Sequence, residues 1–180
     1  MTFRCFTLIG VSTPSANPAT PAARQSLTTV CAAMDGAIPL LTLVLWFVLA
    51  TDGIGEFPAS WPLLVVLAAA VGAYSICELT GFRTPPLEHS NRSAAEVQAD
   101  SWRRFFASTF TRFAVCEAVF LISVALSFVA ESFWVVLLGA VLALPLFFWE
   151  AWPGERNQRR FAAALESGGI PSYLTGRLQD

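Results

Sequence analysis

The segment from residue 112 to residue 150 constrains the fold most strongly, because it holds two long apolar runs separated by a short polar turn. Its uncharged run at 118–130 rises only about 20 Å as a helix, at roughly 1.5 Å per residue. A bilayer core is about 30 Å thick, so a spanning helix that ends at Glu131 must reach back to about Arg112. Glu117 then lies inside the hydrocarbon, where a carboxylate is costly and suggests a function.

The composition excludes an ordinary soluble domain. Of the 180 residues 55% are hydrophobic, and the mean hydropathy is +0.58. Such values, with apolar runs of nearly spanning length, are typical of membrane proteins. The net charge of −2 indicates no general attraction to nucleic acid, so we expect no nucleic-acid partner. All basic residues are arginine, which hints at a bacterial genome of high GC content.

We predict an all-α polytopic membrane protein with four transmembrane helices, arranged as two hairpins with an amphipathic helix between them. The predicted segments are a disordered N-terminal tail (1–28), hairpin 1 (29–82), a cytoplasmic loop with the amphipathic helix (83–111), hairpin 2 (112–152) and a cytoplasmic C-terminal tail with a short helix (153–180). Prolines among small polar residues indicate the disordered tail. In the first span Pro39 predicts a kink, because it cannot donate to the carbonyl of Asp35.

The loop between the hairpins carries the pattern of a surface helix. Ser93 followed by Glu96 matches a capping box, and aromatic residues then recur at helical spacing opposite charged ones. This pattern predicts an amphipathic helix lying at the membrane surface and leading into the third span. In the C-terminal tail Glu155 and Arg159 are spaced to pair on a short helix. Leu174 belongs to an apolar series that we expect to dock on a partner or on the membrane.

The charge distribution predicts the orientation. Every arginine falls in the N-terminal tail, in region 83–112 or in the C-terminal tail, whereas the other two loops carry only acidic residues. The positive-inside rule places both termini and the central loop in the cytoplasm. We therefore expect a multi-pass protein of the cell (inner) membrane, with the lipid bilayer as its first partner.

Four intramembrane acids are the candidate site residues. Glu117 and Asp35 are the candidates for proton or cation binding, whereas Glu78 and Glu150 suit interfacial carboxylates that pair with arginine. Cysteines adjoin three of these acids or precede them by one turn. These cysteines, weak candidates for metal ligands, are Cys31, Cys77 and Cys116. Adjacent helical residues point about 100° apart, so a thiol and its neighbouring acid do not both face one centre well. We expect no metal, no other cofactor and no structural disulfide.

One span carries a local resemblance to a known family. The segment Phe113–Val129, with a Glu-Ala step in a long apolar helix, resembles the carboxylate helix of rotary ATP synthase c subunits. The resemblance implies that Glu117 matches the proton-carrying carboxylate. It covers about one helix in four, and the second span lacks the alternating glycines of the family's partner helix.

The sequence favours a non-catalytic accessory or assembly subunit of a membrane complex. The second span carries the small-residue pairs Ala68/Gly72 and Ala69/Ala73, which allow close helix packing against a membrane-protein partner or a second copy. The alternative is a proton- or cation-linked transporter or channel component that uses the intramembrane carboxylates. A quinone-linked redox enzyme would need paired cysteines on the outer side. We identify no catalytic residues and expect no enzymatic activity.

Overall fold

The structure is a computed structural model that describes residues 19–50, 54, 56–88 and 92–175. Every regular element in the described part is helical. The elements are α1 (Ala19–Asp35), α2 (Ala37–Leu49), α3 (Ser60–Thr80), α4 (Ala94–Ala130), α5 (Phe133–Glu150), α6 (Glu155–Leu165) and the 3₁₀ turn η1 (Glu166–Gly168). Four helices are long and apolar enough to cross a membrane: Ala23–Leu49, in which α1 and α2 count as one, Ser60–Thr80, Ala94–Ala130 and Phe133–Glu150. The predictions of an all-helical fold and of four helices long and apolar enough to span a membrane are confirmed.

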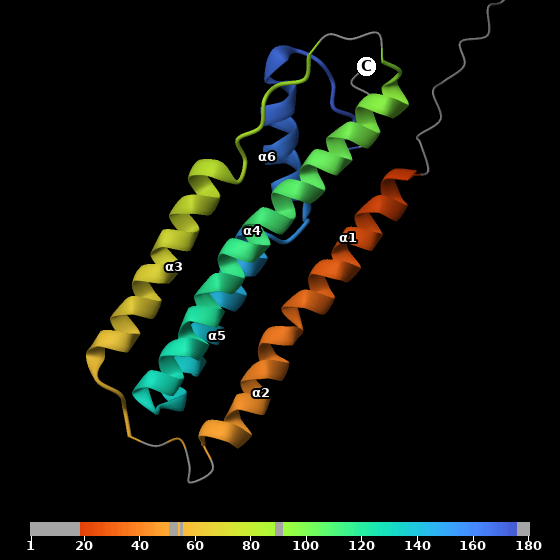
Figure 1. The fold of residues 1–180 in the computed structure, drawn as a ribbon. Coiled ribbons are helices and arrows are strands. Elements are labelled where there is room, and N and C mark those ends of the chain that lie inside the picture. Colours follow the sequence, from red (N-terminus) through yellow and green to blue (C-terminus); the bar gives the residue numbers. More distant parts are fainter. Residues whose placement is uncertain (1–18, 51–53, 55, 89–91, 176–180) are drawn as a thin grey trace, which may run out of the picture.

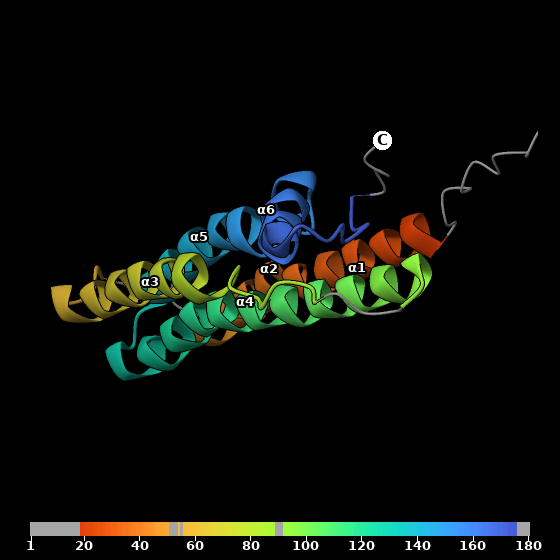
Figure 2. The same ribbon diagram turned by 90° about the horizontal axis from the view of Figure 1, so that it is seen from above.

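The helix α5 holds the bundle together, since α2, α3 and α4 all pack against it. Figure 1 shows α1 and α2 as one long rod along one side of α4 and α5, and α3 along the other side. In the turned view α5 and α6 lie on the same side of α4 (Figure 2). Of the consecutive helices α2 and α3, α2 thus packs mainly on α5, and α3 packs on both α4 and α5, rather than on each other.

The helices α4 and α5 make the most extensive contact in the bundle. Between them the chain turns at Glu131, which adopts a left-handed conformation with φ 47°. The helices then approach closely at Gly139, where an added Cβ would lie 1.8 Å from the Ser123 hydroxyl oxygen. Ser123 is completely buried. Glycine is therefore required at position 139 because the two helices leave no room for a side chain, and not because of its backbone conformation.

The predicted surface helix is instead the first half of α4. This helix has 37 residues and is about 55 Å long at roughly 1.5 Å per residue. Its first half continues without a break into the apolar half, so the prediction of a separate helix between the two hairpins is wrong. The physical reason is that its apolar face has a protein partner: Phe105 is fully buried and its ring lies 5.5 Å from that of Phe161 in α6. The predicted capping box of Ser93 and Glu96 is confirmed.

The predicted disordered tail is also wrong over residues 19–28, which belong to α1; residues 1–18 lie outside the described part. This stretch is helical because Pro21 falls in the first turn, where its missing N–H costs nothing, and no further proline follows until Pro39. Leu27 is fully buried in the core, so tertiary packing stabilises the stretch. The helix breaks at Gly36 between α1 and α2, as expected from Pro39.

The C-terminal segment packs on its own chain. Leu174 is 1% exposed and belongs to the same apolar cluster as Phe105 and Phe161. The predicted pair of Glu155 and Arg159 forms at 3.0 Å. Leu174 thus packs within its own chain, on α6 and the first half of α4, rather than on another protein or the membrane.

Candidate functional site

Polar side chains converge where α3 and α5 end beside α4, and we call this end of the bundle the α6 end. Ser108 of α4 donates a hydrogen bond to the carbonyl oxygen of Gly81, directly after α3. Arg112 of α4 donates one to the carbonyl oxygen of Glu150, the last residue of α5. From Arg112 to Ala130 α4 rises about 27 Å, which matches the hydrocarbon thickness. The α6 end therefore lies at one boundary of the expected membrane.

Arg112 is the central residue of this end, and its side chain is 1% exposed. Its Nε donates to the carbonyl oxygen of Ser108 at 3.3 Å, and its guanidinium lies over the Phe82 ring, 4.3 Å from the centroid. An added Cβ at Gly81 would lie 2.5 Å from Arg112 Cδ, so glycine leaves room for the arginine. A buried guanidinium needs acceptors, and main-chain carbonyls supply them here.

The side chains of α4 and α6 also satisfy the end of α5. The last carbonyl groups of a helix lack partners within the helix. Asn157 Nδ2 donates to the carbonyl oxygens of Glu150 at 3.1 Å and Trp152 at 2.9 Å, and Arg156 donates to that of Trp149 at 2.8 Å. With Arg112 these residues fix the end of α5 in place.

Glu78 forms a two-pronged ion pair with Arg160 of α6. The two nitrogen–oxygen distances are 2.8 and 2.7 Å. The guanidinium of Arg160 also lies over the Phe82 ring, 4.0 Å from the centroid, so two arginines share this ring. The hydrogen bonds with the Glu78 carboxylate raise the pKa of Arg160 above its ordinary value. Glu78 thus pairs with an arginine, 82 residues away along the chain.

Glu150 differs from Glu78, because its side chain is fully buried and no donor in the described residues reaches either carboxylate oxygen. The neighbouring carboxylate is that of Glu78. Two adjacent carboxylates repel each other when both are ionised, and Arg160 neutralises one of them. The predicted pairing with arginine therefore involves Glu78, whereas Glu150 receives arginine only at its main-chain carbonyl.

Two of the three described cysteines meet at this end. Cys77 of α3 and Cys116 of α4 are each 1% exposed, and the Cys77 thiol lies 3.9 Å from the carbonyl oxygen of Arg112, one helical turn before Cys116. Cys31 of α1 is buried in the same apolar cluster. Within the part of the chain that the structure describes, no three His, Cys, Asp or Glu side chains are arranged to hold a metal ion.

The two proton or cation candidates lie apart from this cluster. Glu117 lies about 7 Å farther along α4 than Arg112, at roughly 1.5 Å per residue, and is partly exposed. It forms no hydrogen bond or ion pair with the described residues. Asp35, directly before the break at Gly36, is 9% exposed, and its Oδ1 likewise has no partner in the described part. Glu117 lies on the same outward face of α4 as Leu121, which is 52% exposed.

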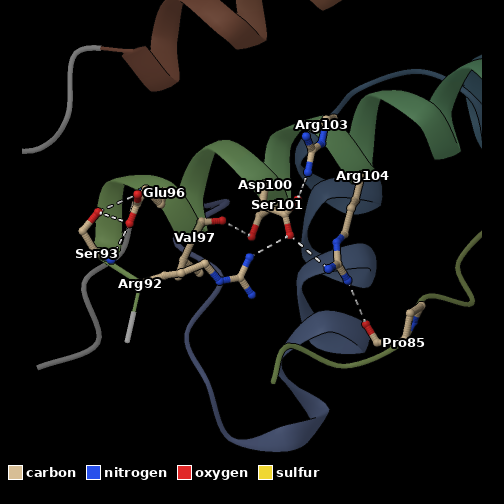
Figure 3. Close-up of polar contacts among 9 residues, drawn as sticks. All are labelled: Pro85, Arg92, Ser93, Glu96, Val97, Asp100, Ser101, Arg103 and Arg104. Carbon is tan, nitrogen blue, oxygen red and sulfur yellow. Dashed lines mark hydrogen bonds and ion pairs between the residues drawn. The ribbon is translucent and has the colours of Figure 1, made fainter. Parts of the chain in front are cut away.

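A second charged cluster lies in the first half of α4, beyond the α6 end. Figure 3 shows Asp100 surrounded by three arginines, with nitrogen–oxygen distances of 3.6 Å to Arg92 and 3.0 Å to Arg104; Arg103 is the third. Arg104 also donates to the carbonyl oxygen of Pro85 at 3.4 Å. This cluster fastens the segment between α3 and α4 to the side of α4.

Sequence reasoning missed the roles of Arg160 and Asn157, which it places only in the short helix of the C-terminal tail. The one available signal was the amphipathic pattern of α6, whose buried side includes Asn157 and Phe161. Comparison with known proteins yields no relative: no protein-family model, no curated protein and no solved structure matches the chain. The all-helical fold and the four helices long and apolar enough to cross a membrane indicate the class of a multi-pass membrane protein.

Proposed function

We propose that this chain is a non-catalytic accessory or assembly subunit of a membrane complex. In this proposal it spans the bacterial cell (inner) membrane as two hairpins, with both termini in the cytoplasm. The charge distribution supports the orientation, because Arg112, Arg156 and Arg160 lie at the α6 end, whereas the acidic residues Glu56 and Glu131 lie in the loops of the opposite end. Arginine-rich segments are retained on the cytoplasmic side.

The observation that carries the proposal is that the two small-residue pairs of α3 lie on different faces of the helix. Ala73 is 4% exposed and packs inside the bundle, so the pair Ala69/Ala73 serves the chain itself. Ala68 is exposed, and no atom lies within 4 Å of the place where a Cβ would sit on Gly72. The pair Ala68/Gly72 therefore faces outward with open space above it. Small residues on such a face let a second helix approach closely, which lipid chains do not require.

The test is purification of the full chain in mild detergent with identification of the bound polypeptide. The variant Gly72→Leu fills the open space, so we expect the partner to be lost. The matched control is Val71→Leu, because Val71 is 61% exposed but points about 100° away on the same helix. A chemical cross-link of twice the chain mass would identify a second copy as the partner. Equal recovery of the partner with both variants would overturn the proposal.

A second candidate function, a proton- or cation-linked transporter or channel component, is favoured by Glu117. This carboxylate lies at membrane depth on the outward face of α4, without a partner in the described residues. Intramembrane carboxylates in that situation mark ion or proton pathways. The test is proton-gradient-dependent flux in liposomes. If this function is correct, Glu117→Gln abolishes the flux and the surface control Glu155→Gln preserves it. Equal flux in both variants excludes Glu117 from the pathway.

A further inference from the structure

The contact between Cys77 and Cys116 is a feature that neither the accessory nor the transport function uses. The Sγ atom of Cys77 lies 3.9 Å from the carbonyl oxygen of Arg112. In an α-helix that carbonyl accepts the backbone N–H of the residue four positions later, which here is Cys116. The sulfur of α3 therefore lies against the turn of α4 that carries the second thiol. Both side chains are 1% exposed and belong to the same buried cluster.

The surroundings of the two thiols contain both charge signs. Arg112 of α4 supplies a positive charge, and Glu78 of α3 and Glu150 of α5 supply negative charges. The oxygens of Glu78 are occupied by Arg160, whereas those of Glu150 receive no hydrogen bond in the described part of the chain. The guanidinium of Arg112 is the positive charge that favours a thiolate at either cysteine. A thiol must lose its proton before it attacks a disulfide.

We propose that Cys77 and Cys116 form a redox-active dithiol that small-molecule disulfides convert into a disulfide bond between α3 and α4. In the first step one thiolate attacks the small disulfide, a protein–small-molecule S–S bond forms, and one small thiol leaves. The other cysteine then attacks the protein sulfur of this mixed disulfide, the Cys77–Cys116 bond forms, and a second small thiol leaves. The two protons of the cysteines end on the two released thiols, and the two electrons reduce the small disulfide.

The consequence is a covalent link at the place where α3 ends. The end of α3 is already held through Glu78 on Arg160 and through Phe82 under two guanidinium groups. The oxidised form adds a bond to α4, so its unfolding temperature is expected to rise. If the α6 end faces the cytoplasm, as proposed above, the resting form is the reduced dithiol, because cytoplasmic thiols are kept reduced.

The chain has a fourth cysteine, Cys5, outside the described residues, and Cys5→Ser removes it from the test. The full chain in detergent is treated with the membrane-permeant aromatic disulfide 4,4′-dithiodipyridine. An isolated thiol keeps one pyridylthio group, whereas a dithiol releases two thiopyridone molecules and keeps none. We therefore expect intact-protein mass spectrometry to show the loss of two hydrogen atoms at the pair, and digestion to give a peptide linking Cys77 to Cys116. The unfolding temperature should rise and return after reduction.

The matched variants are Cys77→Ser, Cys116→Ser and Cys31→Ser. Each of the first two removes the second attacking thiol, so the remaining cysteine should keep a pyridylthio group or stay unreacted. Cys31→Ser should leave the linked peptide unchanged. The proposal is overturned if both cysteines of the wild-type pair carry separate adducts, if Cys31 forms the link, or if the pair reacts only after unfolding.

Discussion

The guanidinium of Arg112 on α4 donates a hydrogen bond to the main-chain carbonyl oxygen of Glu150, 38 residues later at the end of α5. Through this contact the buried charge of Arg112 joins α4 to the end of α5 by way of a main-chain acceptor. The acceptor is a carbonyl group that the helix itself leaves without a partner. This hydrogen bond therefore offsets part of two costs at once: the burial of the guanidinium and the burial of an unpaired carbonyl group at the end of α5.

Replacement of Arg112 by methionine should destabilise the protein. The variant keeps an apolar chain of similar length but removes the donors to Glu150 and Ser108. Hydrogen bonds with a charged partner contribute about 1.5–3 kcal/mol, so we expect a loss of about 2–3 kcal/mol in the free energy of unfolding. The measurement is denaturant unfolding in micelles. Arg103→Met is the control, because that side chain is 80% exposed, and its effect should stay within about 0.5 kcal/mol. Equal effects would contradict the central role of Arg112.

The room that Gly81 leaves for Arg112 predicts a strong coupling between the two positions. Gly81→Ala would place a Cβ 2.5 Å from Arg112 Cδ and force the arginine to move. We expect a loss of about 1–3 kcal/mol from overpacking. In the background of Arg112→Met the same change should cost less, because the flexible methionine yields more easily. A double-mutant cycle with a coupling near zero would show that the glycine serves another purpose.

The crossing of α4 and α5 gives a prediction with a built-in control. Gly139→Ala would place a Cβ 1.8 Å from the Ser123 hydroxyl oxygen and 2.2 Å from its Cβ, whereas Gly72→Ala meets open space. We expect the first variant to lose about 1–3 kcal/mol and the second to be neutral or slightly stabilising. Combination of Gly139→Ala with Ser123→Gly should recover part of the loss in a thermal unfolding assay. If the two alanine variants melt at the same temperature, the helices do not cross this closely.

The sequence predicts the spans well because an apolar run of spanning length has few other structures open to it. It fails where the same pattern has two physical solutions. The aromatic face of the first half of α4 would look identical in sequence whether lipid headgroups or another helix of the chain covered it, and in the structure Phe161 of α6 packs on Phe105. The start of α1 was hidden by the neighbouring prolines, since its stability comes from the burial of Leu27 rather than from a local signal.

The α6 end was predictable only in part. Apolar runs place Glu78 and Glu150 near one membrane boundary, but the pairing of Glu78 with Arg160 spans 82 residues and has no local signature. The contact of Cys77 with Cys116 is hidden for the same reason, because motifs reveal thiol pairs only at short spacing. Contacts between helices depend on rotation about each helix axis, which apolar spans fix poorly, since most of their surface is apolar.

We expect the partly buried ion pair of Glu78 with Arg160 to contribute more to the stability of the protein than an exposed ion pair does. The two side chains are 29% and 34% exposed, against 64% and 68% for Glu155 and Arg159 on the same helix α6. Solvent screening limits exposed pairs to about 0–1 kcal/mol, so Glu155→Gln should change stability by less than about 0.5 kcal/mol. Glu78→Gln should cost about 1–2 kcal/mol, because it removes a two-pronged, charge-assisted contact and leaves Arg160 with only the Phe82 ring. Unfolding in micelles at low and high salt checks both values. A Glu78→Gln loss as small as that of Glu155→Gln would mean that the pair orients α6 without stabilising it.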